Sequence, residues 1–161
     1  MPIYMKYGKI EGPVTGKHKG WIRLDSAQIG VHRNVTTPTE RGANREANVP
    51  SISEVVVTKP QDSSSARLFN ESLQGKGVKV TIDFVEDDNE APYMSIELEN
   101  VLISSYSISG SGGDSNNRPI ESLSLNFTKI TFSTKPTSSS KDPKDSKDKA
   151  AWNLATGSST P

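Results

Sequence analysis

Few residues in this chain have the chemistry of a catalytic group. Its 161 residues include two histidines and no cysteine, which excludes disulfide bonds, thiol catalysis and cysteine-based zinc sites. His18 and His32 both fall in polar, turn-like stretches, and we predict that both are simply solvated. The Gly-x-Ser-x-Gly turn of a serine hydrolase is missing from the sequence. We therefore predict a protein that is not an enzyme and has no catalytic residue.

Two loop segments have the composition of a ligand site. The glycines of 110–113 could cradle a phosphate, but the Lys-Ser/Thr step that completes a phosphate-binding loop does not follow them. The run 86–90 carries four acids but lacks the alternating ligands and central glycine of a calcium loop. We predict a solvated hairpin tip for the acidic run, and neither a metal nor a cofactor for the chain.

The charge balance and the N-terminus limit the classes of partner. The 19 basic residues match 19 acidic ones, so no net field attracts nucleic acid or anionic lipid. The Lys-rich run 141–149 interleaves lysines with aspartates and is typical of a solvated linker. The first residues have no apolar run of a secretory signal, and nothing resembles a membrane-spanning stretch. We expect a protein that is folded in the cytosol, without membrane insertion.

The elements that would position any surface are mostly strands. Period-two alternation, which is typical of a strand with one buried face, runs through 78–84, 94–108 and 123–127. In the first of these, Lys79, Thr81 and Asp83 share the polar face, which we expect to be wet. The parity then shifts at Ile130 and Phe132, which predicts a bulge or a strand buried on both faces. Further strands are predicted at 3–7, about 20–31 and 54–58.

One helix is predicted over about 62–74. Asp62-Ser63-Ser64 supplies a start signal and Gly75 a stop. Its expected apolar face consists of Ala66, Phe69 and Leu73, with Leu68 alongside. We expect this helix to cover the open flank of a β-barrel.

Three polar stretches interrupt the strands. The segment from about 32 to 50 is longer than most structureless connections in compact domains, which indicates a functional extended loop. The glycine- and serine-rich segment 109–114 predicts a turn between two long strands. The stretch 137–149 is too polar to be buried, and apolar character returns at 150–155, where we predict a short docking strand. The predicted division is a domain over 1–136 and a tail over 137–161.

Several segments taken together resemble the Hcp (haemolysin-coregulated protein) family, the inner-tube protein of type VI secretion systems. They cover nearly all of 1–135 and the region of Trp152, in the family's order. The segments are IELENVLISSYS at 96–107, PIESLSLNFTKI at 119–130, SEVVVTK at 53–59, the helix at 62–73 and Trp152-Asn153.

The resemblance implies a mainly β fold, a two-sheet barrel with one flanking helix and a long extended loop. Six copies would close into a ring, and rings would stack into a tube like that of contractile phages. The sheath, the spike and baseplate proteins, and effectors would be its partners. The tube would leave the cell for the exterior or a target cell without a cleavable signal peptide.

In the family the extended loop reaches a neighbouring ring, and this position corresponds to 32–50. We hypothesise that this loop contacts the acidic run on the next ring, where matched charges would set the register. The loop residues are Arg33, Glu40, Arg41, Arg45 and Glu46, and their counterparts are Glu86, Asp87, Asp88 and Glu90.

Two other functions remain open at this point. A secreted effector or a variant outside the main tube would keep the same fold. A carbohydrate-binding or hydrolytic β-sandwich would need a carboxylate pair or an exposed aromatic platform, and Trp21 and Trp152 are better explained by packing.

Overall fold

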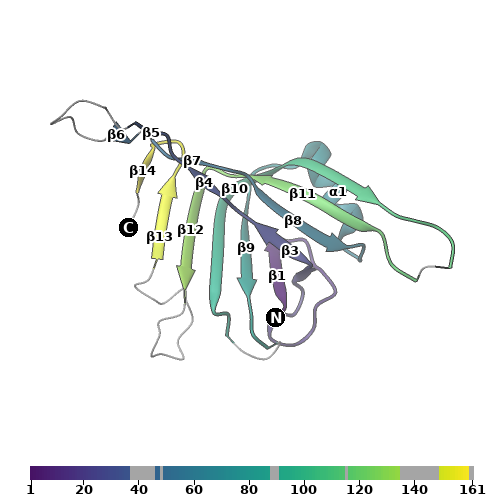
Figure 1. Ribbon diagram of the computed structural model, residues 1–161. Helices are drawn as coiled ribbons and strands as arrows, with labels where there is room; N and C mark the ends of the chain where they lie inside the picture. The colour runs from purple at the N-terminus through teal and green to yellow at the C-terminus, as the bar shows by residue number, and fades with distance from the viewer. Residues whose placement is uncertain (37–45, 48, 88–90, 115, 135–148, 160–161) are drawn as a thin grey trace.

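The computed structural model (Figure 1) describes residues 1–36, 46–47, 49–87, 91–114, 116–134 and 149–159. Strands predominate and there is one α-helix, α1 (Ser65–Gln74), besides a short 3-10 turn (Gly16–His18), among these residues. No helix in the described part is both long and apolar enough to span a bilayer. The strands are β1 (Ile3–Tyr7), β2 (Ile22–Leu24), β3 (Ser26–Gln28), β4 (Val31–His32), β5 (Val35–Thr36), β6 (Glu46–Ala47), β7 (Ser51–Ile52), β8 (Val55–Pro60), β9 (Val78–Phe84), β10 (Met94–Ser109), β11 (Ile120–Asn126), β12 (Lys129–Thr134), β13 (Lys149–Asn153) and β14 (Ser158–Ser159).

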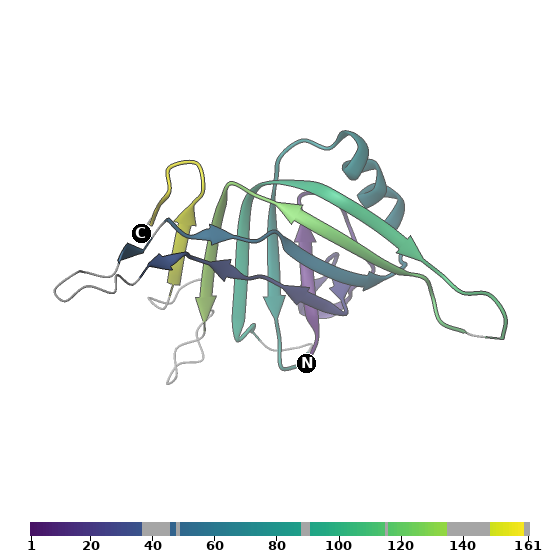
Figure 2. The same cartoon turned by 45° about the horizontal axis from the view of Figure 1, so that its top comes forward.

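Ten strands form one antiparallel sheet that β10 divides into two halves. In the first half-sheet, the beginning of β10 lies between β9 and β12, β1 and β2 follow β9, and β13 and β14 follow β12. In the second half-sheet, the end of β10 pairs with β11, followed by β8 and β3. Figure 2 shows the strands of the second half-sheet crossing in front of the first. The mainly β fold with one helix is confirmed.

The closed barrel is not confirmed, because no strand pairing among the described residues closes the sheet on itself. The two half-sheets share β10 on one side. On the other side the chain passes directly from β2 to β3 at Asp25, whose backbone N–H donates to the Thr58 carbonyl at 2.8 Å. The single strand predicted over 20–31 is therefore wrong: the chain changes partner from β1 to β8 within it.

The parity shift near Ile130 reflects a turn, and neither a bulge nor a doubly buried strand. β11 ends at Asn126 and β12 begins at Lys129, with buried Phe127 between them. The Thr128 N–H donates to the Glu99 carbonyl at 3.1 Å, where β10 itself changes direction. The two strands therefore follow different parts of β10.

The core lies between the half-sheets and consists of alternate residues from both. Val80 and Ile82 of β9 are fully buried, as the alternation predicted. The opposite face of β9 is not wet as a whole: Thr81 and Asp83 are buried, and only Lys79 of the three predicted residues is exposed. The main members of the core are Met5, Tyr7, Ile22, Leu24, Val55, Val57, Leu68, Val80, Ile82, Ile96, Leu98, Val101, Ile103, Leu123, Leu125, Phe127 and Ile130.

Helix α1 lies against β10, but not through the face that its sequence predicts. Leu68 is its one buried apolar side chain, whereas Phe69 is 51% exposed and Leu73 69% exposed. Phe69 meets the Tyr106 ring edge-on, with ring centroids 5.6 Å apart. The helix starts at Ser65, because polar bonds at Asp62 fix its first turn, and Gly75 ends it.

The predicted loop over 32–50, here called the arm, has a two-stranded base. β4 pairs with β7 and β5 pairs with β6, so the chain leaves and returns as an antiparallel pair. In Figures 1 and 2 the base of the arm extends past β13. Residues 37–45 and 48 of the predicted loop lie outside the described part of the chain.

The burial of Leu68 generates a first prediction. Leu68→Ala should lower the free energy of unfolding by about 2–5 kcal/mol, because it removes buried methyl groups and leaves a cavity. Leu73→Ala is the matched control in the same helix and should change it by less than about 0.5 kcal/mol. Urea denaturation followed by circular dichroism measures both. Equal effects of the two substitutions would contradict the buried position of Leu68 and the exposed position of Leu73.

Candidate assembly surfaces

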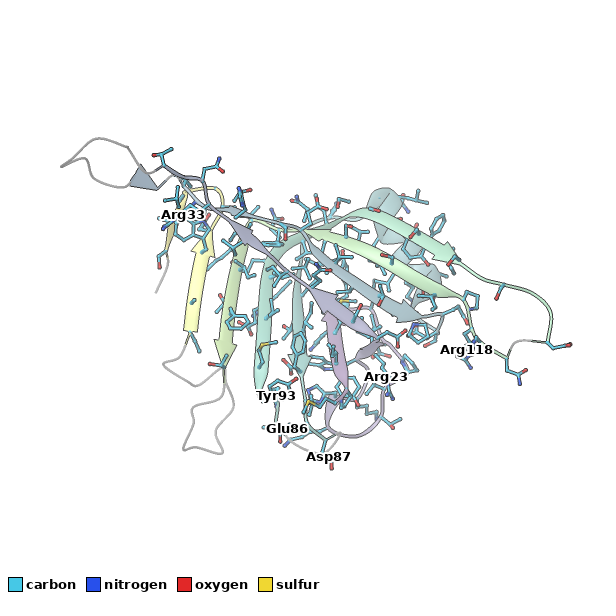
Figure 3. All side chains as sticks on the ribbon, in the orientation of Figure 1. Arg23, Arg33, Glu86, Asp87, Tyr93 and Arg118 are labelled. Atoms are coloured by element: carbon cyan, nitrogen blue, oxygen red, sulfur yellow. The ribbon has the colours of Figure 1, made fainter. Side chains whose placement is uncertain are left out.

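The structure separates the two charged surfaces predicted from the sequence. Arg33 is exposed at the base of the arm, and Glu86 and Asp87 are exposed at the turn that follows β9. Figure 3 places Arg33 at one end of the molecule and the two acids at another. The arm and this acidic tip are therefore not brought together within one copy, and a contact between them would require two copies.

The remaining predicted residues of these surfaces are described only in part. Glu46 belongs to β6, of which the structure describes the backbone. Outside the described residues lie Glu40, Arg41 and Arg45 of the arm, and Asp88 and Glu90 of the tip. Their proposed charge matching stays a prediction.

The base of the arm rests over the C-terminal strands. An apolar pocket of about 390 Å³ lies between them, walled by Ile29 and Ile52 on the arm side and by Phe132 and Trp152 on the sheet side. β13, which carries Trp152, pairs with β12 along five residues. The C-terminal strand therefore contributes to the seat on which the arm is held.

His18 is buried, and the prediction that it is solvated is wrong. Its side chain is 6% exposed and its Nε2 lies 3.0 Å from Asp83 Oδ2. The imidazole stacks on Tyr4 at 5.0 Å between ring centroids and meets Trp21 edge-on at 4.8 Å. This contact joins residues 65 positions apart, so the residues around His18 in the sequence could not predict it.

The histidine belongs to a polar network that crosses three strands. Ser95 donates from its hydroxyl to Asp83 Oδ1 at 2.7 Å, and the Ser133 hydroxyl donates to the Ser95 carbonyl at 3.4 Å. In a serine hydrolase the histidine must reach the serine oxygen, whereas here the carboxylate lies between His18 and Ser95. The network has a structural geometry: it holds the segment that carries His18 onto the outer face of the first half-sheet.

His32 is exposed, as predicted, and its Nε2 lies 2.9 Å from Asn34 Oδ1 within the arm. Within the described part of the chain, no three side chains of the metal-binding types are grouped to hold an ion.

A second network, centred on a lysine, fixes the helix to the sheet. Lys59 and Glu121 are opposite each other on β8 and β11, both fully buried, with Nζ 2.5 Å from Oε2. Lys59 also reaches Asp62 Oδ1 at 3.1 Å, and Asp62 accepts the backbone N–H of Ser64 at 2.8 Å. The start of α1 is thereby attached to two strands of the second half-sheet.

Two further hydroxyls complete this network. Ser65 donates from its hydroxyl to Glu121 Oε2 at 2.7 Å, and Tyr106 donates to the other carboxylate oxygen. Burial, and then this hydrogen bond to Glu121, hold the pKa of Tyr106 well above its usual range. Every oxygen of the Glu121 carboxylate is thus occupied, which is the condition for a buried charge to be tolerated.

A sequence signal for this pair existed and was missed. Lys59 continues the parity of Val55 and Val57, and Glu121 has the parity of Leu123 and Leu125, so each charge falls on the core face of its strand. A charged residue at an apolar position of two strands that pair indicates a buried ion pair.

The outer face of the second half-sheet is covered by hydroxyl groups. The register aligns Ser107 of β10, Ser122 of β11, Thr58 of β8 and Ser26 of β3 in one row. The Ser26 and Thr58 hydroxyls are 2.5 Å apart. The four residues of the row are polar and uncharged. A carboxylate is also present on this half-sheet: Glu54 accepts from Ser104 Oγ at 2.8 Å and from Asn126 Nδ2 at 3.3 Å.

Comparison with known proteins gives one family. The family model described as "Type VI secretion system effector, Hcp" matches residues 4–133. The protein hcp1 of Pseudomonas aeruginosa is 30% identical over 107 residues, a match that spans 65% of this chain and 65% of that relative. The alignment therefore covers slightly less than two thirds of the relative's length.

Solved structures share the fold. One described as a type six secretion system protein has a TM-score of 0.82 at 24% identity and is covered over 99% of both chains. Hcp1 from Salmonella typhimurium has a TM-score of 0.76 at 17% identity, with 99% of this chain and 98% of that one covered. A cap that terminates the tube of the anti-feeding prophage has a TM-score of 0.62 at 11% identity, covering 83% and 88%.

The buried ion pair generates a prediction about stability. Glu121→Leu should cost about 3–5 kcal/mol in the free energy of unfolding, because Lys59 is left as a buried charge without its main partner. The double variant Lys59→Met/Glu121→Leu should recover at least half of that loss, since both charges leave together. Urea unfolding of the two variants measures the difference. A single variant that loses less than about 1 kcal/mol would contradict the network described above.

The pKa of Tyr7 generates a prediction about alkaline pH. Burial, followed by the charge of Glu71, raises the pKa of Tyr7 from 10.0 to about 12. Below pH 10 the phenol is protonated in both the folded and unfolded states, and its contribution to stability is complete. Above pH 10 the unfolded chain loses its proton first, so stability falls as the pH rises towards 12, by on the order of 2–3 kcal/mol.

This loss should be smaller in Tyr7→Phe, which has no phenol to titrate at this position. Urea unfolding at pH 9, 10.5 and 11.5 compares the slopes, with Tyr93→Phe as a control that removes a phenol elsewhere. Identical slopes in the unsubstituted protein and Tyr7→Phe would refute the assignment.

Proposed function

Since the chain belongs to the family of type VI secretion system effectors named Hcp, as its sequence resemblance predicted, we propose that it is a structural subunit of the type VI inner tube. The observation that supports this proposal most directly is the fold itself, which matches a type six secretion system protein over 99% of both chains. The arm and the acidic tip project from opposite parts of that fold. We take the protein to act through these surfaces and not as an enzyme.

In this proposal six copies close side by side into a ring. A ring requires two different surfaces of the subunit to meet with a rotation that closes. Among the described strands, β2, β3 and β14 each end a branch of the sheet. Exposed strand edges are a liability in a monomer, and pairing or packing between neighbouring subunits would cover them. We infer that the two half-sheets then act together as the barrel wall of the ring.

Stacking of rings needs a second, open contact along the tube axis. We assign it to the arm, with Arg33, Arg41 and Arg45 as its positive residues, and to the acidic tip of the next ring. The separation of these surfaces in Figure 3 is compatible with a contact between copies. Charge pairs at such a rim set register and direction more than affinity.

The inner wall of the tube must let cargo pass. The hydroxyl row of the second half-sheet is a candidate for such a wall, because its four residues are polar, uncharged and at least partly exposed. The partners in this proposal are the sheath, the spike and baseplate proteins and the effectors carried inside the tube, with no nucleic acid and no membrane insertion. The subunit would assemble in the cytoplasm and then be exported without a cleavable signal peptide.

We also propose that residues 1–136 form the tube-building domain and that 137–161 is a tail. The family match ends at residue 133, and the tail returns as β13 and β14 on the edge of β12. The tail supports the base of the arm, because Trp152 of β13 lines the apolar pocket beneath it.

The first test of the proposal is the mass in solution. Size exclusion with light scattering should give a species of about six times 17.4 kDa, with ring-shaped particles in negative-stain images of the same fraction. A strict monomer over a wide concentration range, in the presence and absence of the other tube components, would reject the tube-subunit proposal.

The arm generates a second test. Arg41→Glu/Arg45→Glu should leave single rings intact and raise the protein concentration needed for stacking by about tenfold, since like charges would then face each other. Arg67→Glu/Arg118→Glu makes the same change of charge at exposed positions outside the arm and should not affect stacking. Sedimentation and images of tube length measure both. Unchanged stacking in the arm variant would exclude the arm as the charged contact.

A further inference from the structure

A second charged surface, here called the basic cleft, lies beside the turn that follows β1. It consists of two adjoining hollows of about 350 and 300 Å³, which share Lys6, Gly8 and Trp21 in their walls. Lys9 and Lys19 line the first hollow, and the second is completed by Lys79, Thr81 and Glu97. The half-buried Trp21 ring is held by its edge contact with His18, so the buried histidine network positions the wall of the cleft.

The cleft carries an excess of positive charge. Its four lysines are all exposed and face two glutamates, Glu11 and Glu97, which leaves an excess of two positive charges. The only ion pair among the described members joins Lys79 and Glu97 at 3.8 Å, with the Lys79 side chain still 61% exposed. An anionic group that enters the cleft would therefore find several ammonium groups beside the Trp21 side chain.

The acidic tip lies at the far end of the same strands. β1 and β9 are antiparallel, with Lys6 opposite Thr81 and Ile3 opposite Phe84. Five residue steps separate Lys79 from Phe84 at the end of β9, or about 17 Å of extended strand, and Glu86 follows the end of the strand. Screening at physiological salt acts over about 8 Å, so the tip and the cleft of one copy do not neutralise each other.

We propose that the basic cleft receives the acidic tip of a second copy, so that successive subunits are joined head to tail. Tip and cleft are different surfaces with complementary charge at opposite ends of one strand pair, and such a heterologous contact repeats into a ring or an open filament. The inference deepens the proposed tube function and rests on it. The cleft and the arm are alternative partners of the same acidic tip, and the experiment that follows distinguishes them.

A charge-exchange experiment on the full chain tests this contact. The cleft variant is Lys6→Glu/Lys19→Glu, and the tip variant is Glu86→Lys/Asp87→Lys; all four residues are exposed. Each variant alone should need at least about tenfold more protein to assemble. The cleft variant has an excess of negative charge in its cleft and repels the acidic tip, and the tip variant has lost the net negative charge of its tip. An equimolar mixture should assemble again, since each variant then offers the complement of the other. Light scattering, sedimentation velocity and negative-stain images measure assembly.

The matched control is Lys17→Glu/Lys149→Glu, which makes the same change of charge at exposed lysines that do not line the cleft. It should assemble like the unsubstituted protein. Thermal melts followed by circular dichroism check that all variants fold. In 1 M salt, where screening acts over about 3 Å, the difference between the variants and the unsubstituted protein should shrink.

Two results would overturn the inference: a mixture that stays unassembled, or a cleft variant that assembles like the unsubstituted protein. If the cleft variant is unaffected while Arg41→Glu/Arg45→Glu loses stacking, the tip meets the arm, and the tube function stands without the cleft. If the unsubstituted protein forms no rings, the tube function fails. In that case the contact between tip and cleft is tested by looking for complexes in the equimolar mixture of the two variants. If no complexes form, this contact is rejected as well.

Discussion

Both halves of the sheet depend on the change of direction within β10. Asn100 takes a φ of 55° there, and the register with the neighbouring strands shifts between Leu98 and Val101 and again between Ile103 and Ser105. Asparagine accepts this left-handed conformation more readily than most residues, because its short polar side chain can bond locally. Since β10 changes direction, no single strand can follow both of its parts, which is why β11 and β12 are separate.

The two buried polar networks have the same structural role. Each attaches a segment outside the sheet to strands inside it: Lys59 and Glu121 hold the start of α1, and Asp83 holds the segment of His18. An apolar contact of the same size is non-directional, whereas these bonds fix one orientation. Burying the charges costs several kcal/mol in desolvation, so the networks favour one placement of helix and loop over alternatives more than they add to stability.

The sequence predicted the features that depend on neighbouring residues and missed those that depend on residues far apart along the chain. The strand over 78–84 was predicted to the residue, because period-two alternation is local. His18 was misjudged because its partner Asp83 lies far away in sequence, and a polar turn gives no sign that it folds back over the sheet. The exposed Phe69 has a similar cause: the helix is oriented by Lys59, so its apolar pattern did not decide which face is buried.

The chain has no net charge, but the fold places positive and negative residues in different parts of the molecule. With 19 basic and 19 acidic residues, the sequence alone indicated no field, and copies of the protein have no net charge to repel one another. The pairing of β1 with β9 places Lys6 and Lys79 towards one end of these strands and Glu86 beyond the other. Charges of opposite sign at the two ends of these strands favour a head-to-tail contact between two copies at close range. Because salt screens these charges beyond about 8 Å, they would set the direction of the final contact and contribute little to long-range attraction.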